Sequence, residues 1–117
     1  MPSDLAFHRG DLVVSVFQGD FGKPRPALVV QSDLFNPDHG STVLCPLTSD
    51  LTRQGMFRVS LPAADTPGLR TDSEIMIDKM TVMARSRIRQ RIGRLTPEQM
   101  GAVDQALRIW LDLPGIA

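Results

Sequence analysis

A lysine and an arginine alternate with two prolines where an apolar run begins, in the sequence Lys23-Pro24-Arg25-Pro26. Each proline fixes its own φ near about −65° and biases the residue before it toward extended geometry, so both cations are held on a stiff segment. A rigidly held cation loses little freedom when it binds an anion, and a guanidinium offers paired donors to phosphate oxygens. The pattern therefore predicts a phosphate-binding position at Arg25.

A second apolar run, 43–47, ends in two small hydroxyl residues, Thr48 and Ser49. Together the two runs offer a fixed cation and a nearby hydroxyl donor. No cluster of His, Cys or carboxylate residues has metal-ligand spacing, and no glycine-rich loop opens a helix, so neither a metal nor a nucleotide cofactor is expected. The residues alone leave another interpretation open, in which Arg25 is an exposed loop cation, Thr48 caps a strand end and Ser49 is a turn residue.

A strand-rich body would have to position these residues. Apolar runs and alternating patterns predict strands at residues 11–17, 26–31, 42–47, 56–61, 73–77, 81–83 and 91–95. A threonine cap, a proline at the first helical position and a capping-box glutamine predict a helix from Pro97 that stops at Pro114-Gly115. We expect a mainly β fold as one domain over residues 1–117. It would be a small SH3-like barrel or a strongly curved antiparallel sheet with a C-terminal helix.

The formal net charge of the chain is zero, which argues against an overall electrostatic attraction to nucleic acid. One stretch nevertheless concentrates positive charge without an acid between its members. This arginine-rich stretch comprises Arg85, Arg87, Arg89, Arg91 and Arg94. It fits either a local phosphate-binding stripe or a solvated edge that protects a strand from mispairing.

The other reactive residue types predict no further site. Cys45 is the single cysteine and lies in an apolar run, so we expect buried filler rather than a reactive thiol. His8 and His39 are expected to be solvated. The N-terminus does not resemble a signal peptide, and no apolar run approaches the roughly 20 residues of a transmembrane helix. We therefore expect a cytoplasmic protein without membrane contact.

Six short blocks, taken in order along the chain, resemble the successive signature motifs of the MazF/PemK toxins. These are the ribosome-independent RNA-cleaving toxins of bacterial toxin–antitoxin pairs. The blocks are Arg9–Val14, Arg25–Val30, Pro46–Ser49, Gly68–Thr71, Ile77–Lys79 and Ile92–Thr96. Any one block is common, but the ordered series spans nearly the whole chain. The resemblance implies the same compact, barrel-like fold.

The resemblance also implies the toxin of a type II toxin–antitoxin system, a sequence-preferring endoribonuclease. Such an enzyme cleaves single-stranded RNA without a metal, because the 2′-hydroxyl of RNA is the nucleophile. The resemblance assigns Arg25 and Thr48 to the catalytic centre, where both would donate to phosphate oxygens. It further implies a homodimer with RNA in a groove across the dimer face, and an acidic antitoxin whose disordered tail fills that groove. The antitoxin complex would bind DNA.

Beyond these two catalytic residues, we expect several contacts to the substrate. They are Gln18, Lys23, Pro24, Ser49, Asp78 and Lys79. The PemK side of the family places a possible acid–base partner at the position of Asp78, and an arginine two residues earlier, where this chain has Met76. If that arginine stabilises charge in the relatives, this chain must rely on Arg25 or Lys79. The alternative is that Asp78 and Lys79 form an ordinary hairpin pair.

Two other classes of function stay open. A tryptophan near the chain end followed by glycine and isoleucine resembles the gyrase poison CcdB, although here a spacer separates Trp110 from Gly115-Ile116. Otherwise Trp110 is expected to pack in the apolar stripe of the terminal helix. The second class is a catalytically idle module that keeps only an antitoxin-binding surface.

Overall fold

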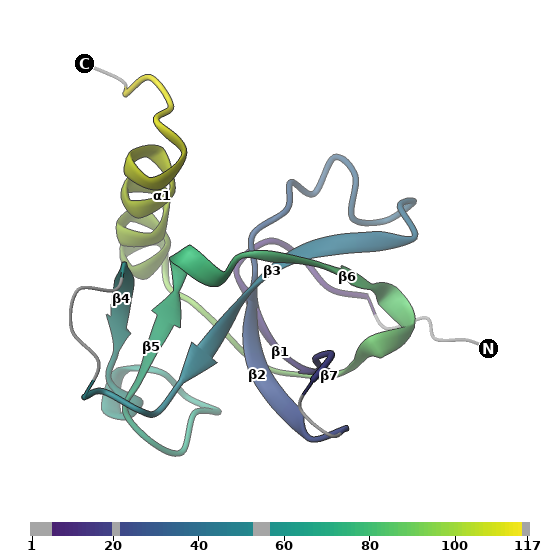
Figure 1. Cartoon of the computed structure of the whole chain (residues 1–117), viewed down its shortest axis with the longest axis horizontal. Coiled ribbons are helices and arrows are strands. Elements are labelled where there is room, and N and C mark those ends of the chain that lie inside the picture. The colour runs from purple at the N-terminus through teal and green to yellow at the C-terminus, as the bar shows by residue number, and fades with distance from the viewer. Residues whose placement is uncertain (1–5, 20–21, 53–56, 116–117) are drawn as a thin grey trace.

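The computed structural model describes residues 6–19, 22–52 and 57–115. Within them the chain forms a seven-stranded antiparallel sheet in the order β4-β5-β3-β2-β1-β7, with β6 also pairing with β3 (Figure 1). The strands are β1 Asp11–Val16, β2 Pro24–Val29, β3 Ser41–Thr48, β4 Arg58–Leu61, β5 Ser73–Met76, β6 Thr81–Ala84 and β7 Ile88–Arg94. The helical elements are the 3₁₀ turns η1 Ala63–Asp65, η2 Ile77–Lys79 and η3 Arg85–Arg87, and the helix α1 Pro97–Leu111.

Alternation along the strands divides the apolar residues between the two faces of the sheet. Leu12, Leu28 and Cys45 lie in register on the face that α1 covers, and they belong to one buried cluster with that helix. Val13 and Ala27 lie in register on the other face, in a second cluster that includes residues of β6 and β7. Each fully buried leucine or valine contributes about 1.5–3 kcal/mol. The two clusters hold β1, β2 and β3 firmly in place.

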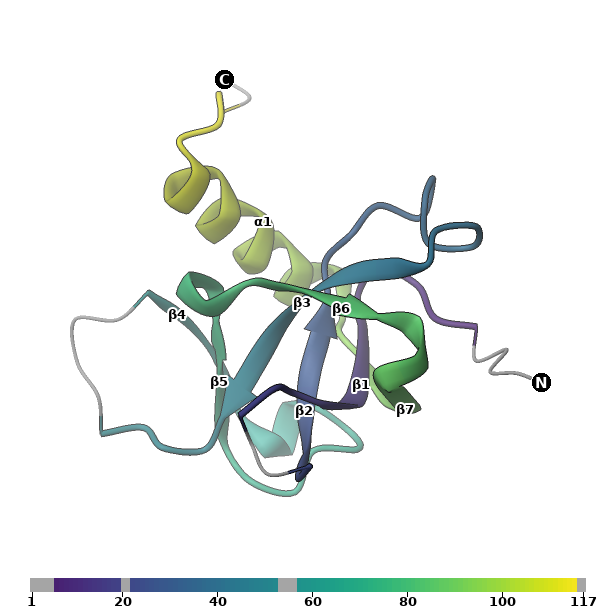
Figure 2. The ribbon, with the colours of Figure 1, turned by 45° about the vertical axis from the view of Figure 1, so that its right-hand side comes forward.

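The sheet is strongly curved but open. Within the described residues its end strands, β4 and β7, do not pair with each other. Two irregularities in the β1–β7 register, after Leu12 and after Val14, increase the local twist. β3 pairs with β5 near its end and with β6 near its start, and η2 makes the corner between those two partners (Figure 2). The prediction of a mainly β fold with a C-terminal helix is confirmed in its curved-sheet form.

The helix begins as predicted and ends earlier. Thr96 Oγ1 accepts the Gln99 N–H at 3.1 Å and Gln99 Oε1 accepts the Thr96 N–H at 2.8 Å, which completes the capping box. Asp112 adopts left-handed geometry with φ 55° and ends the helix before Pro114 is reached. Trp110 stacks on Phe57 with ring centroids 5.9 Å apart. Among the described residues, no helix has both the length and the apolar character needed to cross a membrane.

The arginine-rich stretch forms η3 and the edge strand β7, which starts three residues before the predicted strand. Arg94 Nη1 donates to the fully buried Asp11 carboxylate at 2.7 Å, and Arg91 Nη1 lies 3.7 Å from the same Oδ1. The Arg85 guanidinium lies 4.6 Å from the centroid of the Phe7 ring. The position at the sheet edge fits the expectation of a protected edge strand, and at least three of these arginines contact other groups of the protein.

Candidate active site

Arg25 and Thr48 lie at the ends of neighbouring strands. β2 begins at Pro24, two residues earlier than predicted, so Arg25 is part of the strand rather than of the loop before it. β2 and β3 pair from Val29 opposite Leu44 to Ala27 opposite Pro46, and Arg25 and Thr48 each lie two residues beyond that last pair on their strands. Both side chains line the same two surface hollows.

The Thr48 hydroxyl has one backbone donor. Its Oγ1 accepts the Asp50 N–H at 3.1 Å, so the expected cap at the strand end is present. This bond uses a lone pair of the oxygen and leaves the hydroxyl proton available for donation to a ligand. Asp50 Oδ1 in turn accepts the backbone N–H and the hydroxyl of Thr52, at 3.1 Å and 2.6 Å. Capping and ligand binding are thus compatible at Thr48.

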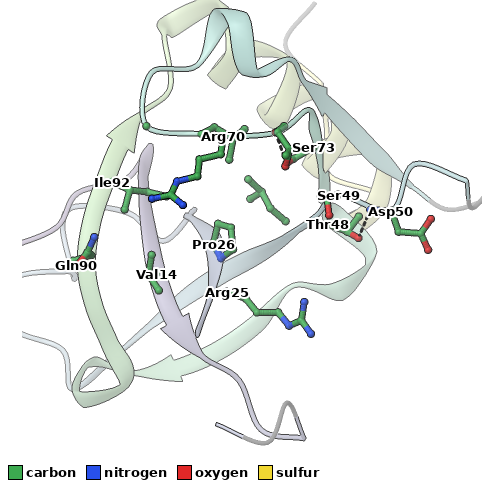
Figure 3. A pocket seen from close by; sticks show the side chains of 14 residues that line it. Val14, Arg25, Pro26, Thr48, Ser49, Asp50, Arg70, Ser73, Gln90 and Ile92 are labelled. Carbon is green, nitrogen blue, oxygen red and sulfur yellow. Dashed lines mark hydrogen bonds between the residues drawn. The ribbon is translucent and has the colours of Figure 1, made fainter. Parts of the chain in front are cut away.

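Two adjacent hollows include both of these residues, and a third hollow adjoins the second. The Arg70 hollow has a volume of about 560 Å³, and residues lining it include Arg25, Thr48, Ser49, Arg70, Gln90 and Ile92 (Figure 3). The central hollow, about 300 Å³, is lined in part by Phe17, Arg25, Pro46, Thr48, Met76 and Lys79. The Arg87 hollow, about 390 Å³, shares Phe17, Pro46 and Lys79 with the central one and also includes Gln18 and Arg87. Because each hollow shares residues with the next, the three form one row with Arg25 and Thr48 between the first two.

The ionisable residues that line this row are mostly cations. Arg70, Arg25, Lys79 and Arg87 carry positive charge, and Asp50 is the acid among the described lining residues. This excess contrasts with the zero net charge of the whole chain. A row of hollows with one predominant sign of charge attracts a polyanion even when the total charge cancels.

The structure brings together five of the eight predicted site residues. Arg25, Thr48, Ser49, Lys79 and Gln18 all line the row of hollows.

The other three predicted residues line none of these hollows. Lys23 and Pro24 are exposed, before and at the start of β2. Asp78 lies in η2, and its Oδ1 is buried without a hydrogen-bond partner among the described residues. The roles of all eight residues in catalysis or substrate binding stay predictions.

Met76, at the position where relatives are expected to carry an arginine, lines the central hollow with Arg25 and Lys79. The residue opposite Met76 on β4 is Arg58, whose side chain is only 7% exposed and whose Nη1 lies 3.7 Å from Glu74 Oε1. Arg58 does not line the central hollow. Arg25 and Lys79 are therefore the cations placed to act there. The sequence did not point to Arg58, because its position opposite Met76 depends on a strand pairing.

The Cys45 thiol does not take part in this site. It is fully buried in β3. Burial raises the pKa of the Cys45 thiol to about 12, with Arg9 opposing the rise and Asp78 adding to it. The expectation of a buried, unreactive thiol agrees with this environment.

Among the residues that the structure describes, no three His, Cys, Asp or Glu side chains gather in a way that could hold a metal ion.

Comparison with known proteins identifies the family. A family model described as the PemK-like, MazF-like toxin of type II toxin–antitoxin systems matches residues 8–111. The chain belongs to this family. The MazF resemblance extends to single relatives: a protein named probable endoribonuclease MazF from Mycolicibacterium smegmatis is 37% identical over 108 residues, which cover 92% of this chain and 98% of the relative.

Two further MazF-family comparisons agree in sequence and in fold. Endoribonuclease EndoA of Bacillus subtilis is 28% identical over 109 residues, covering 90% of this chain and 94% of EndoA. A crystal structure of MazE–MazF (Form-II) from Deinococcus radiodurans superposes with a TM-score of 0.76 at 27% identity, covering 95% of this chain and 100% of the other. Family membership and fold are thus supported by independent comparisons.

Arg70 and Gln90 are two residues of this MazF-like chain for which sequence patterns indicated no role. Arg70 belongs to one of the family blocks, but nothing in that block indicated a contact with a ligand. Gln90 lies within the arginine-rich stretch. Both line the same hollow because the loop after η1 and the strand β7 form two of its walls (Figure 3). Strand spacing along the chain does not reveal such a meeting.

Proposed function

We propose that this protein is the toxin of a type II toxin–antitoxin pair and cleaves single-stranded RNA with sequence preference. The observation that carries the proposal is the placement of the Arg25 guanidinium and the Thr48 hydroxyl at adjacent strand ends, within a row of cation-lined hollows. Family membership supports it, and the relatives from M. smegmatis and B. subtilis are named endoribonucleases. RNA as the substrate would place this activity in the cytoplasm.

In the proposed reaction the 2′-hydroxyl oxygen of the substrate attacks the adjacent phosphorus. A bond forms between these two atoms while the bond from phosphorus to the 5′-oxygen breaks. The 2′-hydroxyl proton is lost and the 5′-oxygen gains a proton, so the products are a 2′,3′-cyclic phosphate and a 5′-hydroxyl. Because the nucleophile is part of the RNA, no metal-activated water is required.

The protein contributes mainly by stabilising charge. Arg25 would donate paired N–H groups to the non-bridging oxygens, which carry more negative charge in the transition state than in the substrate. Thr48 would donate a hydrogen bond from its hydroxyl to the same phosphate, since the Asp50 N–H occupies a lone pair of the oxygen and leaves the proton available. Lys79, which lines the central hollow with both residues, would hold a neighbouring phosphate.

The proposal is tested with the pure protein, a mixed pool of single-stranded RNA and excess EDTA. We expect cleavage at a defined short motif, with 5′-hydroxyl ends that can be sequenced. A DNA copy of the cleaved sequence, or RNA with a 2′-O-methyl group at the cleavage site, should resist. Loss of activity in EDTA that magnesium restores would contradict the metal-independent mechanism.

The same experiment separates the alternative functions. Cleavage of naked RNA without gyrase sets aside a gyrase poison. No cleavage across varied RNA, with retained binding of an antitoxin, would instead indicate an idle binding module.

We further propose an acidic antitoxin and a homodimer as the partners of this toxin. Solved structures of similar fold include a MazE–MazF assembly and an endoribonuclease bound to its cognate antitoxin. The cations of the row would attract the acidic tail of such an antitoxin as they attract RNA. A neighbouring gene encoding a short acidic protein, and a mass of twice the monomer in solution, are the expected results.

A further inference from the structure

The Arg70 hollow is larger than the contact of Arg25 and Thr48 with one phosphate requires. We propose that it is a subsite for a nucleotide next to the cleaved bond, in which Arg70 binds a phosphate and Gln90 reads the edge of a base. This inference rests on the proposed function and assigns to that site a residue that determines specificity. Three observations support it: the loop that carries Arg70 is held in a fixed position, the residues of this loop and of β7 that line the hollow suit a nucleotide, and Arg25 lines the same hollow.

The loop that carries Arg70 is anchored to the helix. Thr66 is buried, and its hydroxyl donates to the Pro62 carbonyl at 3.0 Å and accepts from Gln99 Nε2 at 3.2 Å. Gln99 is the capping-box residue of α1, so the same side chain fixes the helix start and the loop. The Leu69 N–H donates to the Thr66 carbonyl at 3.1 Å. Arg70 therefore projects from a segment with little freedom to lose when a ligand binds.

The loop also rests directly on β7, backbone against backbone. A Cβ atom at Gly68 would lie 1.9 Å from the Ile92 carbonyl oxygen, and one at Gly93 would lie 2.6 Å from the Pro67 carbonyl oxygen. Gly68 has φ +95°, a conformation that other residues rarely adopt. Only glycine fits at both positions. The distance between the loop wall and the β7 wall of the hollow is set by this contact.

The side chains that line the hollow are suited to binding one nucleotide. Figure 3 shows the Arg70 side chain extending from its loop toward Ile92 on β7. No hydrogen bond or ion pair to another described residue holds the Arg70 guanidinium, which is exposed. Val14, Pro26 and Ile92 give the hollow an apolar part. An apolar surface packs against the face of a base, and a guanidinium pairs with phosphate oxygens.

Gln90 supplies the remaining contact. Its amide presents both a donor and an acceptor, which is what the edge of an unpaired base requires. Gln90 lies opposite Val14 on the neighbouring strand, so its position in the hollow is fixed by the sheet. Because the hollow also contains Arg25 and Thr48, the nucleotide bound there would be directly linked to the phosphate that is cleaved.

The experiment compares RNA substrates of different length on the full-length protein. The probe is a nine-nucleotide RNA centred on the mapped cleavage motif, shortened one nucleotide at a time from each end. We expect Arg70→Ala to lower kcat/KM about tenfold on the nine-nucleotide RNA. The loss should disappear once the RNA is shortened to end at the nucleotide in the Arg70 hollow, because the phosphate on the far side of that nucleotide, which Arg70 would bind, is then absent. Arg70→Lys should restore most of the lost activity, since an ammonium still pairs with one phosphate.

Two further measurements make the assignment specific. With a non-cleavable 2′-O-methyl RNA, Arg70→Ala should reduce the slope of log affinity against log salt by about 0.7, the value for one phosphate contact on a single strand. With a randomised RNA pool, Gln90→Ala should relax the base preference at one position beside the cleavage site. Arg89→Ala is the matched control, because Arg89 is the exposed neighbour of Gln90 and does not line the hollow.

The outcomes separate this inference from the proposed function. Equal loss of activity on all substrate lengths, or no loss at all, overturns the subsite while RNA cleavage by the wild-type protein stands. A reduced affinity of Arg70→Ala for the antitoxin alone, with unchanged RNA kinetics, would assign the hollow to the antitoxin instead and also overturn the subsite. A wild-type protein that cleaves no RNA overturns both.

Discussion

Two groups of cations in this protein have opposite surroundings. In the arginine-rich stretch, Arg94 and Arg91 approach the buried Asp11 carboxylate, and Arg85 lies over the Phe7 ring. The contacts of these three side chains stabilise the fold. A ligand that bound these three arginines would have to compete with a buried carboxylate or an aromatic ring.

The second group lines the row of hollows and is assembled from separate parts of the chain. Arg25 belongs to β2, Arg70 to the loop after η1 and Lys79 to η2. Arg87, in η3, is the one member of the arginine-rich stretch that also lines this row among the described residues. The comparison shows that clustering of arginines along a chain is a poor guide to where an anion binds, because acidic or aromatic groups of the fold already contact three of the five arginines and only Arg87 lines the row.

The largest expected effect is on catalysis, from the second group. Arg25→Ala should lower kcat by a factor of about 10²–10³, corresponding to roughly 3–4 kcal/mol for loss of one donor to a developing oxyanion. The melting temperature should stay close to that of the wild-type protein, because Arg25 is exposed. Arg25→Lys should also fail largely, since an ammonium lacks the paired donors. A cleavage rate within about threefold of wild type would contradict the role of Arg25.

The next effect is on stability and comes from the first group. Asp11 is fully buried, and its carboxylate accepts the His8 N–H at 2.7 Å as well as the Arg94 guanidinium. Asp11→Ala should lower the free energy of unfolding by about 2 kcal/mol, because both donors lose their partner while the arginines remain half exposed to water. The kcat of the folded variant should be unchanged.

Urea titration measures the effect of Asp11→Ala, with Asp65→Ala as the control at an exposed acid of η1. If Asp11→Ala abolished cleavage without lowering stability, the distinction between the two groups of cations would not hold.

A smaller effect is expected on the binding of an acidic antitoxin tail. Arg25→Ala and Lys79→Ala should each weaken that binding severalfold, and added salt should weaken it further, because these contacts are exposed charge pairs. RNA should compete with the tail. Fluorescence anisotropy of a labelled tail peptide measures both effects, with Arg89→Ala as the control. Unchanged affinity in both variants would show that the tail binds elsewhere.

The smallest effect concerns the buried Cys45 and appears only at high pH. Its pKa is raised by burial from 9.0 to about 12, so the folded protein keeps the proton over a range in which the unfolded chain loses it. This contribution to stability is present below about pH 9 and is lost as the pH rises toward 12. The free energy of unfolding of Cys45→Ala should therefore fall less steeply over this range. A thiolate absorbance in the folded protein near pH 9 would contradict the shift.

Local patterns predicted the fold well where the cause of the structure was local. The helix start at Pro97 was predicted because Thr96 and Gln99 satisfy the end of the helix by themselves. The strand boundaries that sequence patterns predicted incorrectly depend on tertiary contacts. β7 begins at Ile88 because β1 offers a partner there, and the strand at Ser73 ends at Met76 because η2 turns the chain toward β6.

The candidate site was predictable only in part for the same reason. Arg25 and Thr48 each lie at the end of a recognisable strand, and the ordered family motifs pointed to both. Arg70 and Gln90 lie in a loop and an edge strand whose meeting depends on the curvature of the whole sheet. A single sequence carries no direct signal of that curvature.

The contact between Gly68 and Gly93 has a consequence for how such proteins diversify. Because two bare stretches of backbone set the width of the Arg70 hollow, exchanging side chains on either wall leaves that width unchanged. Positions 70 and 90 can therefore vary among descendants of this chain without any compensating change in the backbone, whereas the two glycines must be inherited together. The preferred RNA sequence can drift by single substitutions while the shape of the binding site is preserved.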